Sequence, residues 1–153
     1  RNKMEKAIYL IGHGNMKLDK FLEILKEKKV DMLVDVRSVP FSKHVPDFNK
    51  ESLKEFLLKS NIDYIHMGSM LGGKRDPEWF NKHMNTKEFE KGIYILQEGI
   101  NGSIAAIMCS EIDYRKCHRR FIGSKLADEG FIVEDISKKG IVQKIGQKTL
   151  VSF

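Results

Sequence analysis

The chain has 153 residues, of which 41% are hydrophobic and 31% are charged, and this length fits one globular domain rather than a two-domain enzyme. The longest uncharged apolar run, residues 103–110, is too short to cross a bilayer, and the basic N-terminus is not followed by the apolar h-region of a signal peptide. We therefore expect neither a membrane span nor a secretory signal, and a cytoplasmic location. The formal charge of +6 favours anionic partners such as phosphates or nucleic acid, but does not choose between them.

Apolar runs alternate with helical spacings along the first half of the chain. Strands are predicted over residues 7–12, 30–36 and 61–67, where short apolar runs occur. A helix is predicted from Leu18, and Asn49 is predicted to cap a second one. Met4 is expected to be the natural start, so we predict one domain over residues 4–153 and leave residues 1–3 out of it.

The second half continues the alternation of strands and helices. Two helices are predicted after the third strand, one around Trp79 and one over residues 86–97. A buried strand (103–109), a helix (117–128), a fifth strand (131–136) and a C-terminal edge strand or hairpin (138–153) follow. This order predicts a single-domain, three-layer α/β sandwich with a mostly parallel central sheet. The order of the strands cannot be predicted from the sequence.

Ionisable residues follow most of the predicted strands. In parallel α/β sheets ligands bind at the carboxyl ends of the strands, so these residues are the candidates for a site. The candidate catalytic groups are His13, Glu111, Cys117 and His118. The candidate substrate- or anion-binding groups are Asp35, Arg37, Lys74, Arg75 and Arg119. Neither a metal nor a cofactor is expected.

The same segments carry a family resemblance. The order IGHGN, DVR-x-x-P-x-S, FN, LGG and C-x-E-x5-CHR runs from Ile11 to Arg119. It closely resembles the bacterial and archaeal family catalogued as domain of unknown function 488, and the last block is the most specific part of the match. The family often has serine where this chain has Gly14. The resemblance implies a compact α/β domain without an assigned reaction.

Each candidate also has a plainer structural interpretation. His13 lies between glycines and is either a general acid/base or a structural turn residue. Asp35 and Arg37 share a strand face, so an ion pair that holds a loop is an alternative to direct substrate contact. Cys117 opens a predicted helix whose N-terminus attracts anions and favours a thiolate, but it is equally a small buried residue.

The Cys117 segment also has arginines that suit a phosphate. Arg119→Ala is expected to abolish ligand binding and to leave the fold intact. A close pair of cysteines, Cys109 and Cys117, in a cytosolic chain is expected to be inert, metal-binding or reactive rather than cross-linked.

Four functional interpretations remain open. We favour an enzyme that acts on a phosphate-bearing small molecule, a nucleotide or a nucleic-acid end, as a hydrolase or transferase dependent on Cys and His. A non-catalytic nucleic-acid-binding module, with arginines on phosphates and aromatic side chains on bases, is the alternative. A zinc site formed by His13, Cys109, Cys117 and His118 is chemically reasonable. A phosphatase or sulfurtransferase loop, C-x5-R from Cys109, is disfavoured because acidic residues inside it would repel a phosphate.

Overall fold

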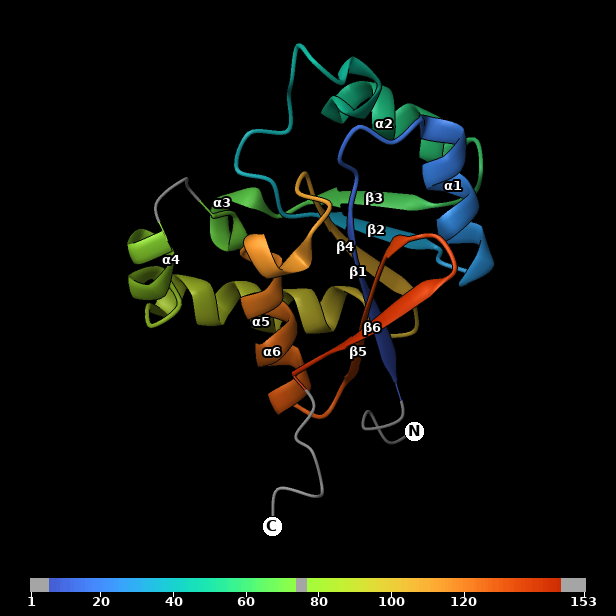
Figure 1. Ribbon diagram of the computed structural model, residues 1–153. Coiled ribbons are helices and arrows are strands. Elements are labelled where there is room, and N and C mark those ends of the chain that lie inside the picture. Colours follow the sequence, from blue (N-terminus) through green and yellow to red (C-terminus); the bar gives the residue numbers. More distant parts are fainter. Residues whose placement is uncertain (1–5, 74–76, 147–153) are drawn as a thin grey trace.

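The computed structural model describes residues 6–73 and 77–146, which form a three-layer α/β sandwich (Figure 1). The central sheet has six strands in the order β3-β2-β4-β1-β5-β6. The strands are β1 (Ala7–Gly12), β2 (Met32–Asp35), β3 (Asp63–His66), β4 (Ala105–Cys109), β5 (Ile132–Lys138) and β6 (Ile141–Ile145). β1 to β5 pair in parallel, and β6 pairs antiparallel with β5. The predicted fold class is confirmed.

Helices cover both faces of the sheet. In Figure 1, α1 and α2 lie on one face and the later helices lie on the other. The helices are α1 (Leu18–Glu27), α2 (Lys50–Leu58), α3 (Gly68–Leu71), α4 (Pro77–His83), α5 (Lys87–Gly99) and α6 (Arg119–Asp128), with short 3-10 turns η2 (Pro46–Phe48) and η3 (Tyr114–Lys116). In the described part of the chain, none of them has the length and apolarity needed to span a membrane.

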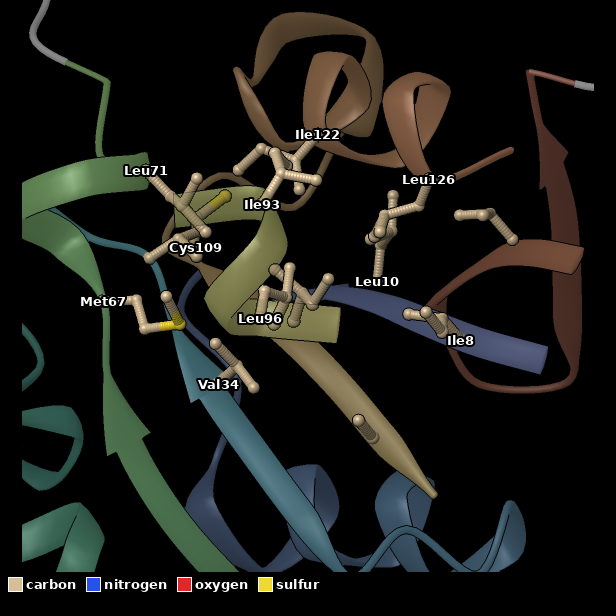
Figure 2. Packing of buried hydrophobic residues seen from close by; sticks show 14 of the residues in the cluster. Ile8, Leu10, Val34, Met67, Leu71, Ile93, Leu96, Cys109, Ile122 and Leu126 are labelled. Atoms are coloured by element: carbon tan, nitrogen blue, oxygen red, sulfur yellow. The ribbon is translucent and has the colours of Figure 1, made fainter. Parts of the chain in front are cut away.

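Each face of the sheet has its own hydrophobic core. The β4 strand, AAIMC, is buried along its whole length and supplies side chains to both cores, as expected for a central parallel strand covered on two sides. Figure 2 shows the larger core, where Ile93 and Leu96 of α5 and Ile122 of α6 pack over the sheet. This packing fixes the start of α6 over the carboxyl end of β4.

The observed elements differ from the predicted ones mainly at their ends. The helix predicted from residue 117 begins at Arg119, and the third strand is shorter than predicted. Asn49 precedes α2 as predicted, but its side chain does not cap the helix. Its Oδ1 accepts a hydrogen bond from the backbone N–H of Ser42 at 2.7 Å instead. This side chain therefore fixes the loop after β2 rather than the helix.

The C-terminal region forms the predicted hairpin in its described part. β5 turns back into β6 through Gly140, which has a φ of 78°, a conformation that favours glycine. Residues 147–153 of the predicted C-terminal segment lie outside the described residues.

The strand order explains where a ligand site can form. From β1 the chain winds through β2 to β3 on one side, and β4 then returns to lie between β2 and β1. The chain leaves β1 toward α1 on one face of the sheet and β4 toward α6 on the other (Figure 1). Sheets of this kind form a ligand-binding crevice at the carboxyl ends of two such strands.

Candidate functional site

A pocket of about 920 Å³ occupies this crevice. Its walls come from the segments after β1, β2 and β4 and from the start of α6. Five predicted site residues line it: His13, Arg37, Glu111, Cys117 and His118. The other lining residues are Ser38, Val39, Phe41, Ser42, Val45, Gly73, Phe80, Cys109, Ser110, Lys116, Arg120 and Phe121.

Arg37 is held rigidly at the pocket by a buried ion pair. Its Nε and Nη2 donate to the two carboxylate oxygens of Asp35 at 2.9 and 2.8 Å, and Nη2 also donates to the Phe48 carbonyl at 2.7 Å. Nη1 points to Nε2 of His13 at 3.3 Å. These bonds use four of the five guanidinium N–H groups, so one N–H of Nη1 remains for a ligand. The ion pair with Asp35 is present and Arg37 also lines the pocket, whereas its direct contact with substrate stays a prediction.

Asp35 lies beneath the pocket and does not line it. Its side chain is fully buried and accepts hydrogen bonds from Arg37 and from the Tyr64 hydroxyl at 2.5 Å. Burial, and then the hydrogen bond to Asp35, raise the pKa of Tyr64. This geometry favours a positioning role for Asp35, since its oxygens hold Arg37, and its predicted contact with substrate stays a prediction.

His13 has both ring nitrogens engaged. Nδ1 faces the Gly14 carbonyl at 2.9 Å, which can only accept, so Nδ1 carries the proton and Nε2 accepts from Arg37. Burial lowers the pKa of His13 to about 4, and its ring stacks on Phe48 with centroids 4.5 Å apart. A neutral imidazole in these contacts positions Arg37. Its predicted role as a catalytic acid or base would require one of the contacts to break.

Cys109 and Cys117 meet on the floor of the pocket. Their sulfur atoms lie in contact as a disulfide, with the Cα atoms 7.8 Å apart. The expectation of two unlinked cysteines is therefore wrong for this structure. Both cysteines belong to the larger core, where β4 and the start of α6 pack together, and this packing brings the two sulfur atoms into contact.

His118 lines the pocket beside the cysteines. Burial lowers its pKa to about 4, although the carbonyl groups of Val36 and Leu71 act in the opposite direction. Among the described residues, its Nε2 has no hydrogen-bond partner although it is buried. Gly73 passes so close to the ring that a Cβ there would lie 2.7 Å from Cγ of His118. Burial therefore keeps this histidine neutral near pH 7.

Arg119 makes structural contacts with all of its donors. It is fully buried, and its Nε donates to Asp135 at 2.9 Å. The other four N–H groups donate to Cys109 Sγ, the carbonyls of Glu111 and Ile112, and the Ser137 hydroxyl. No guanidinium N–H remains for a ligand in this arrangement, which favours a structural role, and the anion-binding role of Arg119 stays a prediction.

Glu111 brings the pocket a carboxylate. Its Oε2 accepts the backbone N–H of Asp113 at 3.0 Å, and its backbone carbonyl touches the end of β1. Gly12 permits this contact, since any Cβ there would collide with the Glu111 carbonyl. The glycine thus sets how closely the Glu111 loop approaches His13.

Two cations of the pocket were not among the predicted site residues. Lys116 and Arg120 both line it, and the Arg120 guanidinium lies 4.4 Å from the centre of the Phe121 ring. Their position next to Cys117 in the sequence is the signal that could have indicated that they line the pocket. Arg115, the arginine of the C-x5-R spacing, is instead exposed and pairs with Asp113. Lys74 and Arg75 lie outside the described residues.

The zinc interpretation gains no support from the geometry. Within residues 6–73 and 77–146, no group of three or more His, Cys, Asp or Glu side chains is arranged to hold a metal ion. The two nitrogens of His13 are engaged with Gly14 and Arg37, and the two sulfurs are engaged with each other.

Comparison with known proteins identifies a family but no activity. The family described as "Domain of unknown function DUF488" matches residues 17–126, which include every helix from α1 to α5 and most of the pocket. Neither the curated proteins nor the solved structures contain a match to the chain. The matched region covers well over half of the sequence, and the chain therefore belongs to the DUF488 family.

Proposed function

We propose that the pocket binds a phosphate-bearing small molecule, a nucleotide or a nucleic-acid end, and that the protein acts on it as an enzyme. The observation that carries the proposal is Arg37, whose guanidinium is fixed by Asp35 with one N–H left at the pocket. A donor held in place before the ligand arrives loses little entropy on binding. Lys116 and Arg120 add two more cations to the same walls.

The chemical groups of the pocket suit a hydrolase or transferase. Glu111 is a candidate general acid or base, and His118, neutral near pH 7, is a candidate base. Cys117 is a candidate nucleophile, which is available only when its sulfur is not joined to Cys109. These three residues line the pocket and are the catalytic candidates of the proposal.

Thermal unfolding against a ligand panel tests the proposal. The panel holds nucleotides, sugar phosphates, inorganic phosphate and short oligonucleotides at two salt concentrations. A ligand present at a hundred times its dissociation constant adds about 2.7 kcal/mol, enough to raise the midpoint by a few degrees. We expect a salt-tolerant rise with one class of small phosphate. A rise with oligonucleotides alone, lost at high salt, would instead support the nucleic-acid-binding module.

A matched pair of variants locates the binding. Arg120→Ala removes a pocket cation and is expected to reduce the rise, whereas Arg115→Ala removes the same charge outside the pocket. The second variant is expected to respond to the ligand as the parent does. An equal loss in both variants would show that the ligand responds only to overall charge.

A further inference from the structure

The proposed anion binding leaves one feature of the pocket unexplained: its two sulfur atoms. Cys109 ends β4 and Cys117 precedes α6, yet both line the pocket and their sulfurs are in contact. Each residue is only slightly exposed, Cys109 at 2% and Cys117 at 6%. The pair is therefore sheltered from other proteins, but faces a space large enough for a small molecule.

Polar donors surround the two sulfurs. The Arg119 guanidinium donates to Cys109 Sγ from 3.0 Å, and the Arg119 backbone N–H donates to Cys117 Sγ from 3.4 Å at the start of α6. Nδ1 of His118 lies 3.8 Å from Cys117 Sγ. A disulfide sulfur is a weak acceptor that gains little from such donors, whereas a thiolate is strongly stabilised by a guanidinium and a helix N-terminus. The surroundings thus suit the reduced pair, and the contact between the sulfurs suits the oxidised pair.

We propose that Cys109 and Cys117 are a redox-active dithiol that exchanges with low-molecular-weight disulfides entering the pocket. The thiolate of Cys117, the more exposed residue of the two, attacks one sulfur of the disulfide RSSR. The RSSR bond breaks, one RS⁻ leaves and takes a proton from water, and a mixed disulfide forms on Cys117. The Cys109 thiolate then attacks the Cys117 sulfur and releases the second thiol. The protein loses two electrons and two protons, and RSSR becomes two RSH.

This activity goes beyond the proposed function and does not require a phosphate-bearing ligand. Its test is equilibration of the whole protein with glutathione and glutathione disulfide at graded ratios. The samples are quenched in acid, alkylated and weighed by mass spectrometry. We expect the protein to change from two alkylated thiols to none as the disulfide fraction rises, and to return when the ratio is reversed.

Single-cysteine variants test the order of attack. Cys109→Ser keeps the attacking sulfur and is expected to accumulate a glutathione adduct, at least tenfold more than Cys117→Ser. Equal adducts on both variants would overturn the assignment of Cys117 as the attacking residue.

If a variant fails to fold, the glutathione titration of the unsubstituted protein still tests the proposal. A disulfide that persists under excess reductant until the protein unfolds would overturn the proposal, because the bond would then be purely structural. Two thiols that stay alkylatable at every ratio would overturn it as well. Neither result bears on anion binding, which the thermal panel measures separately.

Discussion

Arg119 joins three parts of the fold through one buried side chain. Its guanidinium connects Cys109 at the end of β4, the loop carbonyls of Glu111 and Ile112, and Asp135 and Ser137 of β5. A buried guanidinium with every donor satisfied fixes the relative positions of these segments. The loop that carries Glu111 into the pocket therefore depends on a residue that does not line the pocket.

Removal of Arg119 is expected to destabilise the protein. Arg119→Ala leaves the Asp135 carboxylate buried without its partner, at a cost of about 3–5 kcal/mol in the free energy of unfolding. Urea unfolding measures this loss. The double variant Arg119→Met with Asp135→Leu removes both charges and is expected to recover part of it. An Arg119→Ala protein of parental stability that fails to bind ligand would restore the anion-clamp interpretation.

The two buried arginines show which pairings a sequence reveals. Asp35 ends β2 and Arg37 follows two residues later, so their ion pair was a prediction from alternation alone. Asp135 belongs to β5, sixteen residues beyond Arg119 of α6, and no local pattern connects them. The contact of Cys109 with Cys117 could not be predicted from the sequence for the same reason, since it depends on how α6 packs against β4. Both contacts depend on the packing of elements that no local sequence pattern describes.

At the scale of elements, the pairing of β1 with β4 continues beyond the ends of both strands. The backbone N–H of His13 donates to the Cys109 carbonyl at 3.0 Å, and that of Gly14 donates to the Ser110 carbonyl at 2.8 Å. These bonds continue the β1–β4 ladder into the two loops of the pocket. Gly12 lies at the point where the loops come nearest.

Gly12→Ala tests the importance of this approach. The added methyl group would collide with the Glu111 carbonyl, so we expect a loss of about 3 kcal/mol or more in unfolding free energy. Gly99→Ala is the control, because Gly99 ends α5 and an added Cβ would meet nothing within 4 Å. The control is expected to be neutral or slightly stabilising in a chemical denaturation experiment. Equal effects of the two changes would contradict a special role for Gly12.

The existence and type of the elements were more predictable than their functions. β1 was predicted with its observed bounds, because an apolar run ending in glycine is a local signal. The one-turn helix α3 carries no periodicity of its own and was missed. Asn49 was assigned to a helix cap from local preference, but its side chain accepts from the backbone N–H of Ser42 in the preceding loop instead. The same residue type suits both roles, so the sequence alone did not choose between them.

At the scale of the whole molecule, two buried neutral histidines connect stability to pH. His13 and His118 titrate near 6.5 when unfolded, and burial lowers the pKa of both to about 4 in the fold. Between these values the unfolded chain binds more protons than the folded one, so stability is complete above about pH 6.5 and declines as the pH falls toward 4. Each histidine contributes on the order of 3 kcal/mol to this decline.

Unfolding midpoints measured from pH 7.5 to pH 4 test this linkage. His118→Asn cannot take up the proton, so its midpoint is expected to fall less steeply than that of the parent. His44→Asn, at an exposed position, is the control and is expected to follow the parent. Parallel curves for the parent and His118→Asn would show that His118 does not contribute to acid unfolding.

The ion pair of Arg37 with Asp35 has a consequence for the rate at which a ligand binds. Because Asp35 cancels its charge over long distances, Arg37 acts only on a ligand that has already arrived. Long-range attraction then comes from Lys116 and Arg120, whose charges added salt can screen. For the anionic ligand proposed above, association should slow modestly as ionic strength rises while dissociation changes little, so the thermal rise at a hundredfold excess of ligand should persist in salt. Lys116 and Arg120 would thus set how fast the ligand arrives, and Arg37 would set how long it stays bound.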